Sequence, residues 1–145
     1  MLLSDSNSRN LKGVIMKLSA KSRYGLRAMY HLGKSSLSQP VSLNTLAKLS
    51  DVSSPYLEKL LGLLKKSHLV VATRGTNGGY NLAKEAKDIS VGDIIRALEG
   101  EVLSIDCVSK CKKTGCPNKE VFGNLYTEIT QILNKSTLQN MIEKN

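Results

Sequence analysis

The chain has 145 residues, enough for one domain with a modest core and an appended arm. It carries 21 lysine and arginine residues against 12 acidic ones, a formal net charge of +9. No stretch approaches the ~18 apolar residues that a membrane helix needs, so no membrane partner is expected. No apolar block near the N-terminus resembles that of a secretory signal, so we expect a cytoplasmic protein. An enzyme is not expected, because neither a Ser-His-Asp arrangement nor a carboxylate pair emerges.

The positive charge is concentrated in the first part of the chain. Residues 1–90 contain 14 lysine and arginine residues and 5 acidic ones, a net +9, whereas residues 91–145 contain 7 of each. A basic field confined to one part of a chain suits a polyanion-binding surface, because neutralising phosphates releases counterions. The alternative is a lysine-rich surface that only keeps the protein in solution.

Residues 1–15 are polar, rich in serine and asparagine, and without apolar periodicity, which predicts a disordered extension. The codons of residues 12–14 can form a bacterial ribosome-binding sequence just before Met16. We therefore expect translation to start at Met16 and residues 1–15 to be non-native.

Three amphipathic segments follow. An i, i+4 apolar stripe predicts a helix over residues 18–37, and Ser42 caps a short helix over residues 43–49. After a tight turn, Ser54 is the expected N-cap of a third helix, with Pro55 in its first position. The inward face of this third helix is predicted to consist of Leu57, Leu60, Leu61 and Leu64.

Two short apolar runs, residues 69–72 and 80–82, flank a glycine-rich turn and predict a β-hairpin. Ser90 then caps a helix that Gly100 ends. A long amphipathic helix is expected from about Pro117 to Asn134, followed by a short helix over residues 137–142. So long an apolar stripe in so short a chain has little core to cover, which favours pairing with a second copy.

The expected fold class is therefore mainly α with a small β-hairpin. We predict a winged helix-turn-helix over residues 16–100, and a cysteine loop with a long dimerisation helix over residues 101–145.

Two helices joined by a tight turn and followed by a hairpin are typical of a module that reads double-stranded DNA. The second helix enters the major groove and meets the base edges with its N-terminal residues. Arg74 stands at the mouth of the hairpin, where an arginine suits an A·T-rich minor groove; the alternative is a mere connection with an exposed arginine. With the leucine face buried, the helix face left for DNA carries Ser54, Tyr56, Lys59 and Lys66, and Glu58 lies near the same end.

The chain has three cysteines, all within ten residues: Cys107, Cys111 and Cys116. Their odd number and a reducing cytosol argue against a structural disulfide. Three thiolates this close can converge on one soft metal centre, and iron–sulfur clusters and zinc both favour such ligands. An iron–sulfur cluster, a reactive thiol switch and a zinc site are the alternatives.

Several motifs resemble the Rrf-two family of bacterial regulators, with its IscR, NsrR and CymR types. Residues 16–24 are similar to the family's opening, residues 53–60 to its recognition helix, residues 69–80 to its wing and residues 89–94 to the helix after it. The resemblance implies a repressor that binds a pseudo-palindromic operator as a homodimer paired through the long C-terminal helix. By position, it assigns DNA contacts to Ser53, Tyr56, Glu58 and Arg74.

The same resemblance implies that the three cysteines ligate an iron–sulfur cluster of the [2Fe–2S] type. This chain has Lys119 where the IscR type places a histidine ligand, so the fourth ligand is unidentified, with Asp106, Glu120 and an exogenous ligand as candidates. Changes at the cluster are expected to move the loop and alter the spacing of the two recognition helices. The alternative is a cluster-free, CymR-like regulator controlled by a partner protein or by thiol oxidation. An electron-transfer protein is a further rival, but four protein ligands are not visible.

Overall fold

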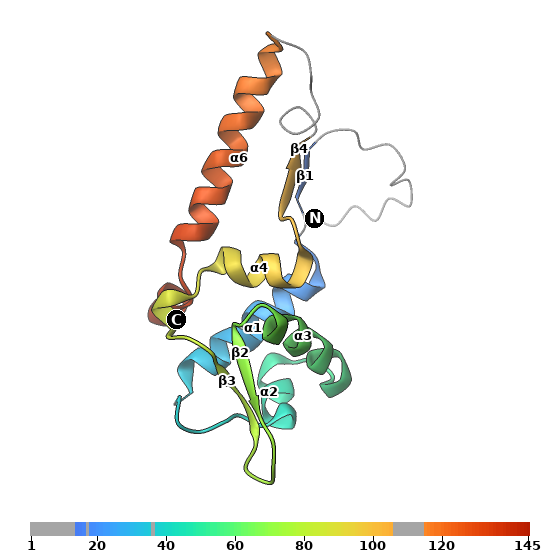
Figure 1. The fold of residues 1–145 in the computed structure, drawn as a ribbon, viewed down its shortest axis with the longest axis vertical. Helices are drawn as coiled ribbons and strands as arrows, with labels where there is room; N and C mark the ends of the chain where they lie inside the picture. The colour runs from blue at the N-terminus through green and yellow to red at the C-terminus, as the bar shows by residue number, and fades with distance from the viewer. Residues whose placement is uncertain (1–13, 17, 36, 106–114) are drawn as a thin grey trace.

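The computed structural model describes residues 14–16, 18–35, 37–105 and 115–145 (Figure 1). Within these ranges the chain is mostly helical, with two antiparallel pairs of short strands. No helix among them is long and apolar enough to cross a membrane. In chain order the elements are β1 (Val14–Met16), α1 (Ala20–Lys34), α2 (Leu43–Ser50), α3 (Ser54–Lys66), β2 (Val70–Thr73), β3 (Gly79–Leu82), the 3₁₀ helix η1 (Ala86–Asp88), α4 (Val91–Glu99), β4 (Leu103–Ile105), α6 (Pro117–Lys135) and α7 (Leu138–Glu143).

Helices α1, α2 and α3 form the helix-turn-helix unit that the sequence predicts. Side-chain caps begin the first two, because Ser19 accepts a hydrogen bond from the N–H of Lys21, and Ser42 from that of Thr45. Asp51 ends α2 in the left-handed conformation, at φ 54°, a conformation that short polar side chains tolerate. The chain therefore reverses within a few residues and enters α3.

The start of α3 differs from the prediction by one residue. Ser53, with φ −66° and ψ 144°, is the N-cap, and Ser54 is the first helical residue. The Ser53 side chain makes no capping hydrogen bond, while the Ser54 hydroxyl donates to Asn44 Oδ1 of α2 at 3.1 Å. The predicted cap was wrong because Pro55 is tolerated anywhere in a first turn, where N–H groups have no intrahelical partner. A proline alone therefore does not fix the helix register.

Strands β2 and β3, with the turn between them, form the wing, and they pair antiparallel with Val70 opposite Leu82. The wing contacts the segment before α2 at Gly79 and Tyr80, which we call the root of the wing. Here Tyr80 and Val41 exchange two backbone hydrogen bonds of 2.9 and 2.8 Å. Gly79 permits this approach: its φ is +156°, and a Cβ there would lie 2.3 Å from the carbonyl oxygen of Val41. The wing is thus fixed to the residues that lead into α2.

One apolar core holds together the head, which we define as α1, α2, α3 and the wing. The four predicted leucines of α3 are each at most 2% exposed, which confirms the inward face. Helices α4 and α7 close the same core from the C-terminal side, and Leu138 of α7 is completely buried in it. The end of the chain, assigned to the C-terminal arm from sequence, therefore returns to pack on α1 and η1.

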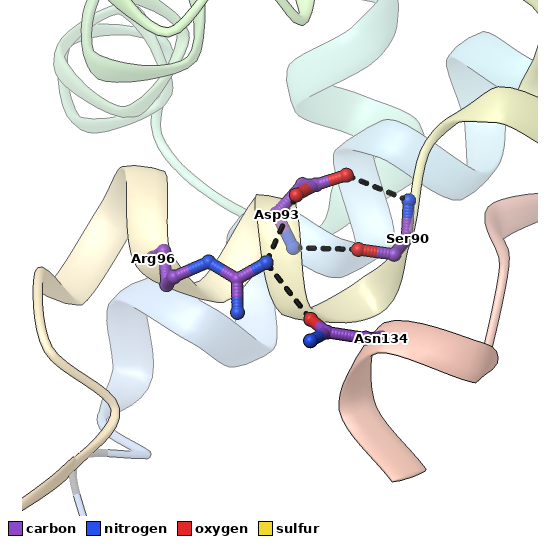
Figure 2. Close-up of polar contacts among 4 residues, drawn as sticks. All are labelled: Ser90, Asp93, Arg96 and Asn134. Carbon is purple, nitrogen blue, oxygen red and sulfur yellow. Dashed lines mark hydrogen bonds and ion pairs between the residues drawn. The ribbon is translucent and has the colours of Figure 1, made fainter. Parts of the chain in front are cut away.

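Helix α4 connects the head to α6 through a polar cluster (Figure 2). A capping box begins α4, because the Ser90 hydroxyl accepts from the N–H of Asp93 at 2.9 Å while the Asp93 carboxylate accepts from the N–H of Ser90 at 3.1 Å. Arg96 Nη2 donates to Asp93 and to Asn134 of α6, each at 2.9 Å. Burial alone would raise the pKa of Asp93, but the hydrogen bonds from Ser90 and Arg96 hold that pKa below its ordinary value.

Strand β1 lies in the stretch that the sequence assigned to a disordered extension. Residues Val14–Met16 pair antiparallel with β4, and Met16 lies opposite Leu103. The structure corrects the expectation of disorder at Val14 and Ile15. A three-residue strand that pairs with a distant segment leaves no periodicity in its own sequence, so the pattern could not reveal it.

Helix α6 extends away from the head, beside the β1–β4 pair (Figure 1). None of its described side chains is buried, and Val121 and Ile132 are 65% and 63% exposed. Of the long apolar stripe predicted for this helix, Val121, Leu125 and Ile132 therefore face solvent in the single chain, while Ile129 and Leu133 are half-buried.

Candidate nucleic-acid interface

Helix α3 has one face in the core and one polar face toward solvent. Lys59 lies on the outer face, fully clear of the leucines that anchor the helix. The structure therefore gathers five of the residues predicted to contact DNA around the start of one helix, while Lys66 lies at its end. The exposed ones are Ser53, Glu58 and Lys59, and the half-buried ones are Ser54 and Tyr56.

The turn between α2 and α3 forms a shallow hollow beside these residues. Asn44 and Lys48 of α2 line the hollow together with Ser53 and Ser54. The hydrogen bond from Ser54 to Asn44 fixes the first turn of α3 against α2. Sequence reasoning missed Asn44 and Lys48, although their i, i+4 spacing places both on one face of α2.

Tyr56 is held by residues of α1. Its ring meets the Tyr24 ring edge to face, with centroids 6.1 Å apart and planes at 87°. The guanidinium carbons of Arg23 and Arg27 lie 5.2 and 5.7 Å from the centroid of the Tyr24 ring. Helix α1 thus supports a residue of the candidate interface, which the sequence pattern did not indicate.

The wing carries Arg74, which is also predicted to contact DNA and is exposed directly after β2. Gly75 follows with φ +112°, so the chain turns back toward β3 in a conformation that favours glycine. Tyr80 in β3 connects this wing to α3: burial raises the pKa of the Tyr80 hydroxyl, and the nearby Glu58 carboxylate raises it further. Helix α3 and the root of the wing are therefore neighbours.

The predicted metal ligands are only partly within the described residues. Cys116 is half-buried at the N-cap of α6, and Gly115 before it has φ +78°. Cys107 and Cys111 lie outside the described residues. Of the candidate fourth ligands, Glu120 is exposed in the first turn of α6, and Asp106 lies outside the described residues. In the ranges that the structure describes, no three potential ligands gather at one point.

The end of α4 is bound to the start of α1 by one carboxylate. Glu99 accepts hydrogen bonds from the backbone N–H and hydroxyl of Ser19 and, at 2.9 Å, from the hydroxyl of Ser22. Burial alone would raise the pKa of Glu99, but these hydrogen bonds to its ionised form lower it below its ordinary value. The chain continues from Glu99 through β4 toward the cysteines. The hydrogen bonds of Glu99 therefore fix the start of this segment to α1 of the head.

Comparison with known proteins fits this arrangement. A family model for Rrf2, described as an iron-dependent transcriptional regulator, matches residues 18–144. Protein rrf2 of Nitratidesulfovibrio vulgaris is 34% identical over 131 residues, which are 88% of this chain and 87% of that protein.

Two solved structures share both fold and sequence with the chain. One is CymR, the global cysteine regulator of B. subtilis. Its structure has a TM-score of 0.75 and 32% sequence identity, and the match covers 90% of this chain and 99% of CymR. IscR of T. potens has a TM-score of 0.73 and 39% identity over 89% of this chain and 88% of that one. Helix-turn-helix, wing and long C-terminal helix all lie inside the matched region, and the chain belongs to the Rrf2 family of transcription regulators.

Proposed function

We propose that the chain is a sequence-specific repressor that binds a pseudo-palindromic operator as a homodimer. In this proposal α3 enters the major groove and the wing reaches the adjacent minor groove. The observation that carries it is the outer face of α3, where Ser54, Glu58 and Lys59 surround the helix start beside a wing that presents Arg74. The apolar stripe of α6 that faces solvent supports the pairing of two chains.

Each outer residue has a chemistry suited to duplex DNA. A glutamate such as Glu58 can accept a hydrogen bond from the amino group of cytosine, and Lys59 can neutralise a phosphate. Tyr56 presents a ring that is fixed on one side by Tyr24. Two such heads must match half-sites about one helical turn apart, so the spacing between heads controls affinity.

Substitution of Arg74 by alanine tests the DNA-binding mode. The probe is a duplex that the wild-type protein selects from a random-sequence pool, and fluorescence anisotropy at fixed salt measures affinity. Arg74→Ala is expected to weaken binding by about 1–3 kcal/mol with an unchanged unfolding curve, because its side chain is exposed. Lys144→Ala, an exposed lysine after α7, is the matched control and should bind normally. Unchanged affinity of Arg74→Ala would contradict the proposed role of the wing.

We also infer that the three cysteines hold an iron–sulfur cluster that controls DNA binding. The donor set fits, because thiolates are the preferred ligands of such clusters, and Cys116 stands where the chain enters α6. If a cluster is bound, its iron atoms would react with oxidants and small molecules. The chain's own part is mechanical: the segment that carries the ligands joins β4 to α6, and α6 is bound to α4 through Arg96 and Asn134.

Both kinds of relative are represented among the similar proteins, so the cluster-free, CymR-like mode is the competing proposal. Anaerobic purification followed by visible spectroscopy and iron and sulfide analysis separates the two. The cluster proposal predicts a visible absorption band at about 420 nm in the wild-type protein. Cys111→Ala should lose this band but still form a dimer. A colourless protein that stays blank after reconstitution would favour thiol oxidation or a partner protein.

A further inference from the structure

We infer that Arg23, in the first turn of α1, binds a phosphate of the DNA backbone, and that Tyr24 positions both this arginine and Tyr56. The inference rests on the proposed function and adds a third element, α1, to the DNA interface. Neither residue was among those that the sequence assigned to DNA.

The geometry centres on the ring of Tyr24. It meets the ring of Tyr56, which lies in the first turn of α3, at a centroid distance of 6.1 Å. The guanidinium carbon of Arg23 lies 5.2 Å from the centroid of the same Tyr24 ring. Tyr24 itself packs against the core of the head, so this stack has a fixed base. Arg23 and Tyr56 thus both contact the Tyr24 ring, and Tyr56 belongs to the first turn of α3, the turn that meets DNA in this class of module.

The two arginines that stack on Tyr24 differ in what else they bind. Arg27 Nη1 donates to the carbonyl oxygen of Ser50 at 3.0 Å, which uses its guanidinium to hold the end of α2. Arg23 is exposed and forms no ion pair with any carboxylate in the described part of the chain. The carboxylate of Glu99, at the same end of α1, is already occupied by Ser19 and Ser22. Arg23 therefore presents uncompensated positive charge.

A stacked arginine is well suited to a phosphate. The planar guanidinium carries five N–H donors in a fixed fork, which suits bidentate hydrogen bonds to a phosphate. The stack also limits the conformations that the side chain would lose on binding. A lysine at this position would keep the charge but lose the planar fork.

The salt dependence of DNA binding tests the inference, with the selected duplex as probe and affinity measured over a series of potassium chloride concentrations. Loss of one phosphate contact lowers the steepness of the plot of log K against log salt by about 0.9, so a homodimer that loses one contact per chain should lose about 1.8. Arg23→Ala should show this decrease and bind about tenfold more weakly at fixed salt, and Arg23→Lys should recover most of the slope. Lys34→Ala is the matched control, because Lys34 makes the same kind of ring contact, 5.2 Å from the Tyr30 centroid, at the opposite end of α1. It should change neither quantity.

Two variants of Tyr24 test its positioning role. Tyr24→Phe keeps the ring and should bind like the wild type, whereas Tyr24→Leu should lose affinity through both Arg23 and Tyr56. Urea unfolding of each variant identifies loss of fold, and Arg23→Gln, which keeps a polar chain on an exposed site, serves if the alanine variant is unstable. An unchanged slope in the arginine variants, with a wild type that binds, would overturn this inference alone. Absence of any wild-type binding would instead overturn the proposed function.

Discussion

Gly79→Ala perturbs the contact that fixes the wing to the head. The new Cβ would lie 2.3 Å from the carbonyl oxygen of Val41 and 2.9 Å from the backbone nitrogen of Ser42, and backbone atoms cannot move aside as a flexible side chain can. Relief requires the wing root to leave Val41, which breaks both hydrogen bonds between Val41 and Tyr80. At about 0.5–1.5 kcal/mol net for each of the two bonds, and about 1–3 kcal/mol for alanine at this φ, we expect a loss of about 2–6 kcal/mol in unfolding free energy.

The same displacement should also weaken DNA binding, because Arg74 moves with the wing. Urea unfolding followed by circular dichroism measures the first effect, and anisotropy with the selected duplex measures the second. Gly62→Ala is the control: nothing lies within 4 Å of a Cβ at this exposed position in α3, so alanine should stabilise the helix by about 0.5–1 kcal/mol. A Gly79→Ala protein as stable as the wild type would refute the reasoning about the wing root.

Two further predictions concern polar groups in the head. Among the described side chains the buried Ser50 hydroxyl has no hydrogen-bond partner, so Ser50→Ala is expected to be neutral or to stabilise by about 1 kcal/mol; a clear decrease in the urea midpoint would contradict this. Glu99→Gln should destabilise by about 1 kcal/mol at neutral pH, after discounting for solvent exposure. The pKa of Glu99 is lower in the folded protein than its ordinary value, so the ionised carboxylate stabilises the fold fully at pH values above the ordinary pKa. This stabilisation is lost as the pH falls through the pKa of the folded state. The difference between wild type and variant, from unfolding curves at several pH values, should therefore shrink on acidification, and a difference that grows would count against it.

Elements with local signals could be predicted from the sequence. The leucine spacing of α3 gave its buried face, and the caps Ser42 and Ser90 marked the starts of α2 and α4, because a cap depends on residues within one helical turn. The register of α3 was predicted wrongly by one residue, since both Ser53 and Ser54 have the chemistry of a cap. Only the backbone dihedral angles, set by the preceding turn, distinguish them.

Features that depend on distant pairing could not be predicted. The β1–β4 pair joins the segment before α1 to the segment after α4, and the Tyr24–Tyr56 contact crosses from α1 to α3. Leu138 enters a core built mostly from earlier residues. None of these leaves a pattern in its own segment. The candidate site divides in the same way: Tyr56 was predicted on its helix, but the α1 residues that hold it were found only in the structure.

Selection of duplexes from a random-sequence pool, followed by sequencing, tests most directly whether the outer face of α3 reads DNA. The wild type should enrich an inverted repeat with half-sites about one helical turn apart. Glu58→Ala should enrich a sequence relaxed at one matching position in each half-site, because the carboxylate that accepts from a base is gone. No enrichment over the starting pool at physiological salt, or an identical sequence for both proteins, would contradict the account.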